Sequence, residues 1–137
     1  MPTVLILEDE DPIRRFLAAS LEWEGHETIT YPDAAPALDE VDFDTVDLII
    51  TDIGMPTDGR LAIQAMRTIG VTAPIIAMSG GLKPGDDKHL LSLGAQCVLP
   101  KPFELDMLLA VMHRLLGVSE HSRSQKDCSL VQIDYEI

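Results

Sequence analysis

The chain has 137 residues and a formal net charge of −13, with 23 acidic side chains against 10 lysines and arginines. This length fits one compact domain with a short appendage and is too short for two ordinary domains. Phosphate backbones and anionic membranes repel a chain this acidic. We therefore expect no direct binding to nucleic acid or membrane. The sequence shows neither an apolar run of bilayer length nor the basic start of a secretory signal, which predicts a cytoplasmic protein.

Five segments have the patterns of β-strands. Residues 4–7, 46–50 and 74–78 are nearly continuous apolar runs, which are typical of parallel strands covered on both faces. Residues 28–31 alternate between polar and apolar side chains, as an edge strand does, and residues 96–99 form a fifth short candidate.

Helical patterns separate these strands. Asp11 as N-cap and Gly25 just past the end bracket a first helix, and Asp33 caps a short second one. Apolar stripes predict helices over residues 61–69 and 105–116, and another helix is expected over residues 85–93, where it stops at Gly94. Strands and helices that alternate with short connections require right-handed crossovers. The sequence therefore predicts a flavodoxin-like (βα)5 fold, a doubly wound parallel sheet with strand order 2-1-3-4-5.

Polar residues follow each core strand of this predicted sheet. Residues 8–11 follow the first strand, Asp52 the third, residues 79–81 the fourth and Lys101 the fifth. In this topology a crevice forms beyond the carboxyl ends of strands 1 and 3. Carboxylates that lie close together repel each other unless a hard dication such as Mg²⁺ neutralises them. We therefore expect Asp9 and Asp52 to be direct Mg²⁺ ligands.

The same residues suit phosphoryl transfer onto a carboxylate. That chemistry needs positioning and charge stabilisation by a metal, a cationic side chain and a hydroxyl. Asp52, Lys101 and Ser79 can fill the roles of acceptor, cation and hydroxyl. In isolation each would more often be a cap, a surface lysine or a loop residue, and only their coincidence favours the functional interpretation. A phosphohydrolase would more naturally carry a second acid two residues after its nucleophile, where Gly54 stands, so we expect no substrate turnover.

Four segments resemble the marker segments of CheY-like response regulator receiver domains. They are Leu7-Glu8-Asp9-Glu10, Asp52-Ile53-Gly54-Met55-Pro56, Ser79-Gly80 and Lys101-Pro102-Phe103. The resemblance spans about residues 3 to 117. It implies a stand-alone, two-component phosphorelay protein that a sensor histidine kinase or histidine phosphotransfer protein phosphorylates on Asp52. It implies no enzyme activity beyond Mg²⁺-dependent self-phosphorylation and self-dephosphorylation.

The resemblance also assigns the metal site. Asp9, Asp52 and the Gly54 carbonyl would bind Mg²⁺ directly, and Glu8 would act through metal-bound water. Glu8 stands where an aspartate is commoner in the family, which lengthens the reach to that water. The segment from Asp52 to Gly59 is also one residue shorter than in many members, so the loop that carries Gly54 differs from theirs.

The phosphoryl site is implied in the same way. Ser79 and Lys101 would bind phosphoryl oxygens, Gly80 would leave room for the group, and the peptide bond before Pro102 would be cis. Val98 stands where the family often has an aromatic residue, so a switch that rotates this ring is not available. We expect phosphorylation to act through the loop after strand 4 and the following helix instead.

We divide the chain into a receiver domain, residues 1–117, and a C-terminal segment, residues 118–137. Apolar and polar residues alternate from Val131 to Ile137, which predicts an added strand on an edge of this domain or of a neighbour. A disordered tail is the alternative. Because no output domain follows, we expect the signal to leave through protein contacts. A homodimer could use helix 4, strand 5, helix 5 or this tail.

Two other interpretations remain open at this point. The chain could be a degenerate receiver that binds proteins without phosphorylation, although it keeps Asp9, Asp52 and Lys101. It could also be the receiver part of a longer regulator.

Overall fold

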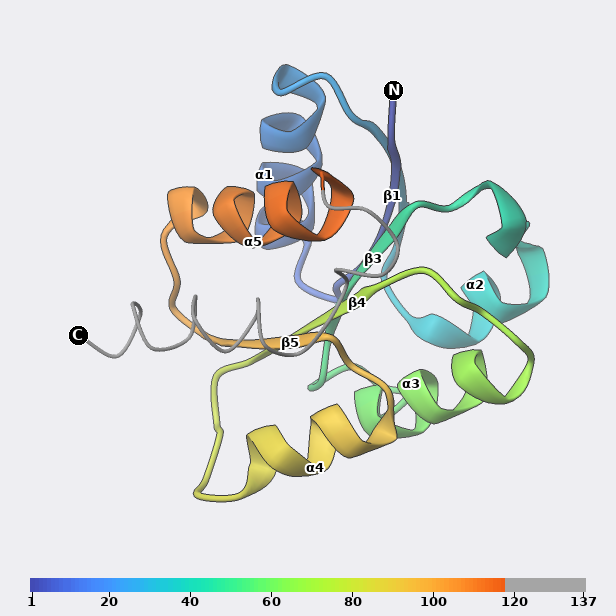
Figure 1. Ribbon diagram of the computed structural model, residues 1–137, viewed down its shortest axis with the longest axis vertical. Helices are drawn as coiled ribbons and strands as arrows, with labels where there is room; N and C mark the ends of the chain where they lie inside the picture. The colour runs from blue at the N-terminus through green and yellow to red at the C-terminus, as the bar shows by residue number, and fades with distance from the viewer. Residues whose placement is uncertain (118–137) are drawn as a thin grey trace.

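The computed structural model describes residues 1–117, so the predicted added strand and tail contacts of residues 118–137 lie outside the described residues. Five parallel strands form one sheet in the order β2-β1-β3-β4-β5, as predicted (Figure 1). The strands are β1 (Thr3–Leu7), β2 (Glu27–Tyr31), β3 (Leu48–Asp52), β4 (Ile75–Ser79) and β5 (Cys97–Pro100).

Five helices connect and cover the strands. They are α1 (Asp11–Trp23), α2 (Ala34–Glu40), α3 (Gly59–Thr68), α4 (Asp86–Leu93) and α5 (Leu105–Gly117), with a short 3-10 helix at Phe43–Thr45 that the sequence analysis did not predict. Asp11 is the first residue of α1 rather than its predicted N-cap, because Glu10 occupies the cap position. Helix α3 begins two residues earlier than predicted, because the Asp58 side chain accepts a hydrogen bond from the Arg60 amide and caps it.

The helices divide between the two faces of the sheet. Helices α2, α3 and α4 cover one face, and α1 and α5 cover the other (Figure 1). All five residues of β3 are buried, whereas the edge strand β2 is partly exposed. Burial on both faces explains why the central strands have continuous apolar sequences. Within residues 1–117, no helix is long and apolar enough to cross a membrane.

The strand register places the carboxyl ends of the strands side by side. Asp52 lies opposite Met78, and Ser79 lies opposite Pro100. Glu8 directly follows β1, which lies between β2 and β3 in the sheet. The residues that end or directly follow β1, β3, β4 and β5 therefore share one rim of the sheet, as the sequence predicts.

Candidate functional site

Three carboxylates meet at the ends of β1 and β3. Glu8, Asp9 and Asp52 each offer an oxygen, and these oxygens lie within 4.8 Å of one another. Glu8 is fully buried and Asp52 is 6% exposed, whereas Asp9 is exposed at the mouth of the site. Clustered carboxylate oxygens are the donors that hard dications prefer, and the exposed Asp9 gives access from solvent. The donor set therefore fits a divalent cation.

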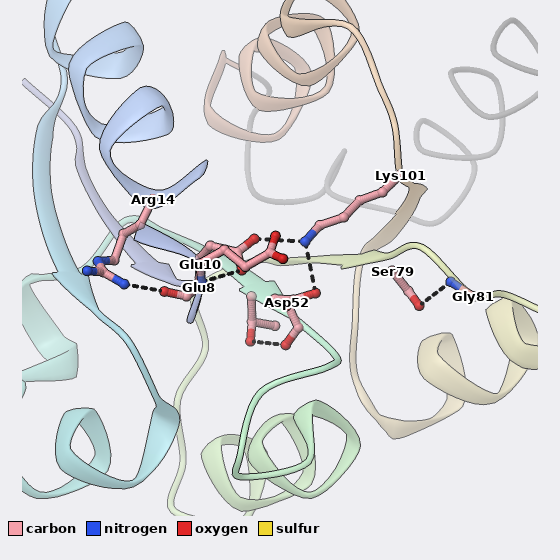
Figure 2. A network of polar contacts seen from close by, with 8 residues as sticks. Glu8, Glu10, Arg14, Asp52, Ser79, Gly81 and Lys101 are labelled. Atoms are coloured by element: carbon pink, nitrogen blue, oxygen red, sulfur yellow. Dashed lines mark hydrogen bonds and ion pairs between the residues drawn. The ribbon is translucent and has the colours of Figure 1, made fainter. Parts of the chain in front are cut away.

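Lys101 is the cation of the site. Its Nζ atom lies 2.8 Å from Oε1 of Glu8 and 3.2 Å from Oδ1 of Asp52, so it bridges the two buried acids (Figure 2). Burial alone would lower the pKa of Lys101, but the hydrogen bond to Glu8 and the charges of Asp52 and Glu8 outweigh burial and raise it. Lys101 is therefore a fixed positive charge beside Asp52 at neutral pH.

Glu8 is held on two sides. Its Oε1 accepts a hydrogen bond from Lys101, and its Oε2 accepts one from the Glu10 amide at 3.2 Å. Burial raises the pKa of Glu8, and the neighbouring Asp52 adds to this effect, while Lys101 and the Glu10 amide oppose it. The long glutamate side chain thus reaches Lys101 directly from the end of β1.

Arg14 supports the same turn and was missed by the sequence analysis. One of its guanidinium nitrogens, Nη1, donates to the backbone carbonyl of Glu8 at 2.8 Å (Figure 2). The other, Nη2, pairs with Asp11. The side chain is only 16% exposed. The signal that could have found it is the spacing of three residues from Asp11, which places the two side chains on one face of a helix.

The shortened loop after β3 closes tightly. The Gly59 amide donates to the Ile53 carbonyl at 3.0 Å, and a Cβ atom at Gly59 would lie 2.5 Å from the Ile53 Cα. Only glycine permits this approach of α3 to the end of β3. Gly54 is exposed, and a Cβ there would lie 3.8 Å from Oδ2 of Asp52. The loop therefore keeps Gly54 beside the Asp52 carboxylate.

Ser79 and Gly80 follow on the same rim at the end of β4. The Ser79 carbonyl accepts from the Lys101 amide at 2.8 Å, while its hydroxyl oxygen is 3.4 Å from the Gly81 amide (Figure 2). A Cβ at Gly80 would lie 3.7 Å from the Lys101 Cβ, at ordinary contact distance, so this position lies directly beside the lysine. The peptide bond between Lys101 and Pro102 is cis, as the resemblance implied.

Val98 lies in the core rather than at the surface. It is 1% exposed and packs in the hydrophobic cluster between the sheet and helices α2, α3 and α4. This aliphatic side chain has no polar group that could interact with the residues at the rim of the sheet.

Comparisons with known proteins identify the family of this chain. The model of the response regulator receiver domain matches residues 4–113. The chain therefore belongs to the response regulator receiver domain family, the receiving modules of two-component signal transduction. Members of this family accept a phosphoryl group on an aspartate and interact with histidine kinases or phosphotransfer proteins.

Individual relatives show how far the similarity extends. Response regulator MprA from Mycobacterium avium is 32% identical over 114 residues, which cover 82% of this chain and 50% of that protein. This chain spans about half the length of the curated relatives it matches. Among solved structures, chemotaxis protein CheY4 of Vibrio cholerae has a TM-score of 0.78 at 29% identity, covering 85% of this chain and 99% of that one. The Francisella response regulator 1452 receiver domain has a TM-score of 0.80 at 27% identity, covering 85% and 98%.

Proposed function

We propose that Asp52 is the phosphoacceptor and that a sensor histidine kinase or histidine phosphotransfer protein is the donor. The observation that carries this proposal is the position of Lys101, whose ammonium bridges Asp52 and Glu8 beside the exposed Asp9. A bare pair of buried acids would repel each other, whereas this arrangement places the Asp52 carboxylate 3.2 Å from the Lys101 ammonium. An ionised carboxylate is the form that attacks phosphorus.

The transfer itself makes few demands on the protein. A carboxylate oxygen of Asp52 forms the new P–O bond as the N–P bond of the donor phosphohistidine breaks, and the imidazole leaves with the bonding electron pair. Lys101 offsets the negative charge that arrives with the phosphoryl group, and the Ser79 hydroxyl is available to donate to one of its oxygens. Gly80 adds no side chain to the space beside Lys101.

Mg²⁺ is the proposed cofactor. Asp9, Asp52 and the Gly54 carbonyl would hold it directly, and Glu8 would hold it through water. When bound, it supplies charge neutralisation for the acids and for the incoming phosphoryl oxygens. Support comes from the three carboxylate oxygens within 4.8 Å and from the exposed Gly54 next to Asp52.

The remaining functional proposals rest on this chemistry. The chain is a cytoplasmic signalling protein without substrate turnover beyond its own Mg²⁺-dependent phosphorylation and dephosphorylation. Phosphorylation changes its contacts with a protein target or with a second copy, through helix α4, strand β5 or helix α5. It acts either by itself or as the receiver part of a longer regulator.

Intact-mass spectrometry after incubation with acetyl phosphate tests the proposal. We expect one phosphoryl adduct with Mg²⁺ present, none with excess EDTA, and none in Asp52→Ala. An adduct that persists in Asp52→Ala would refute the assignment of the acceptor. If the wild-type protein forms no adduct with acetyl phosphate or with any phosphohistidine donor, the result would favour a binding module that works without phosphorylation.

A further inference from the structure

Asp33 makes an unexpected contact. It stands at the N-cap position of α2, where the sequence predicts that its side chain caps this helix, yet the side chain makes no capping hydrogen bond to α2. Both carboxylate oxygens instead accept from one residue of the β3–α3 loop. The Thr57 amide donates to Oδ1 at 2.8 Å and the Thr57 hydroxyl donates to Oδ2 at 2.7 Å. A side chain at the end of β2 thus holds the loop that follows the acceptor.

The charge state of Asp33 supports a strong contact. Burial alone would raise the pKa of Asp33, but the hydrogen bonds from the Thr57 hydroxyl and amide, together with the backbone amides of Ala34 and Ala35, outweigh burial and lower it. The side chain is therefore a carboxylate at neutral pH, and hydrogen bonds to a charged acceptor are stronger than those between neutral groups.

Other parts of the loop are fixed at their own ends. Met55 is buried at 6% exposure in the cluster that includes residues of α2 and α3, and Gly59 is bonded to Ile53. Gly54 lies exposed between these points, next to Asp52. Thr57 ties the outer part of this loop to the segment between β2 and α2, which carries Asp33.

We propose that Asp33 is a positioning residue that acts through Thr57, holding the shortened β3–α3 loop so that the Gly54 carbonyl stays at the metal site. This inference rests on the proposed function of Asp52 and Mg²⁺. It extends that function to two residues that touch neither the metal nor the phosphoryl group.

Full-length variants test the contact in two measurements that need no phosphorylation. Calorimetric titration gives the Mg²⁺ affinity, and amide exchange in metal-free buffer reports the opening of residues 53–59. Thr57→Val removes the hydroxyl donor at nearly constant volume, and Thr57→Ser keeps it. Thr28→Val is the matched control, because the Thr28 hydroxyl also donates to a carboxylate, that of Glu22 at 2.6 Å, away from the site.

We expect Thr57→Val and Asp33→Ala to weaken Mg²⁺ binding by about 10-fold, the equivalent of one hydrogen bond to a charged group. Amides of residues 53–59 should exchange faster in both variants. Thr57→Ser should behave like the wild type, and so should Thr28→Val. If Thr57→Val keeps wild-type affinity and exchange, if Thr57→Ser fails as badly as Thr57→Val, or if Thr28→Val shows the same loss, the positioning role is wrong.

The experiments distinguish a failure of the proposed function from a failure of the positioning role of Asp33. A wild-type protein that takes no phosphoryl group at Asp52 would refute the proposed function. In that case, the Mg²⁺ affinities and exchange rates of the Thr57 variants still support or overturn the role of Asp33.

Discussion

Gly59 offers a sharp test of how the end of β3, with Asp52, is positioned. Replacing it with alanine would place a Cβ atom 2.5 Å from the Ile53 Cα and 2.6 Å from the Asp52 carbonyl oxygen. Both of these are backbone atoms, which cannot turn away as the end of a side chain can. The end of β3 and the start of α3 must separate by about 0.9 Å to bring the shorter approach to 3.4 Å, where ordinary contact begins.

Two opposing terms set the expected loss of stability. Overpacking of this kind costs about 1–3 kcal/mol. Alanine regains up to about 1 kcal/mol over glycine in a helix, although less at the first residue of α3. We therefore expect Gly59→Ala to lower the free energy of unfolding by about 1–2 kcal/mol. Because a misplacement of about 1 Å can cost about 100-fold in rate, phosphoryl acceptance by Asp52 should slow by up to that factor.

Denaturant unfolding measures the first effect, and intact-mass time courses with acetyl phosphate measure the second. Gly81→Ala is the control, because the described part of the chain leaves open space around a Cβ at Gly81, and its φ angle is not positive. Gly59→Ala with wild-type stability and wild-type phosphorylation rate would refute the reasoning. Equal losses in Gly81→Ala would show that the effect does not arise from contact with β3.

Three further predictions follow from the charges and packing of the site. Mg²⁺ should raise the melting temperature as RT ln(1 + [L]/Kd), worth about 2.7 kcal/mol at 100 times Kd, and Asp9→Asn should abolish the gain in scanning calorimetry. A melting temperature unchanged by millimolar Mg²⁺ would contradict the metal site. Because the pKa of Asp33 is lowered in the folded state, its stabilisation is present above the unfolded pKa and is lost as the pH falls through the folded pKa. Asp33→Asn should therefore be less stable than the wild type at neutral pH. Chemical denaturation in acid should show this difference in stability closing, and a difference that persists there would argue against a role for the Asp33 charge. With Val98 buried in place of an aromatic ring, phosphorylation should change amide exchange chiefly in residues 79–93, and a change confined to β5 and α5 would disprove this.

The sequence could predict the fold because each local pattern agreed with the same topology. Alternating strands and helices with short connections permit few arrangements, and right-handed crossovers select among them. Boundaries were less predictable. The apolar run at residues 46–50 suggested a strand from Val46, but β3 begins at Leu48, because Val46 is the C-cap of a 3-10 helix over Phe43–Thr45. Hydrophobicity alone does not distinguish a buried cap from a buried strand residue.

The rim residues of the site could be predicted for the same topological reason, since parallel strands end at one edge of the sheet. The contacts among them could not. Lys101 reaches Glu8 across 93 positions of sequence, and Asp33 reaches Thr57 across 24. A pattern that identifies Asp33 as a helix cap is correct about its position and wrong about its side chain. Which hydrogen-bond partner a side chain finds depends on the loop that lies opposite it in the fold. A sequence alone does not give the distance between the side chain and that loop.

The far end of the sheet shows why such contacts matter for the rim. Arg67, near the end of α3, donates to the carbonyls of Val71, Ala73 and Gly94 at 2.8–3.1 Å. Burial lowers the pKa of Arg67, yet a guanidinium stays protonated, so these carbonyl dipoles take the place of solvent around the charge. Gly94 leaves space for this side chain, since a Cβ there would lie 2.6 Å from the Arg67 Cγ. One arginine thus ties the loop before β4 to the loop before β5. Because Ser79 ends β4 and Lys101 directly follows β5, we expect that fixing the starts of the two strands helps to hold the spacing of hydroxyl and ammonium at the other end.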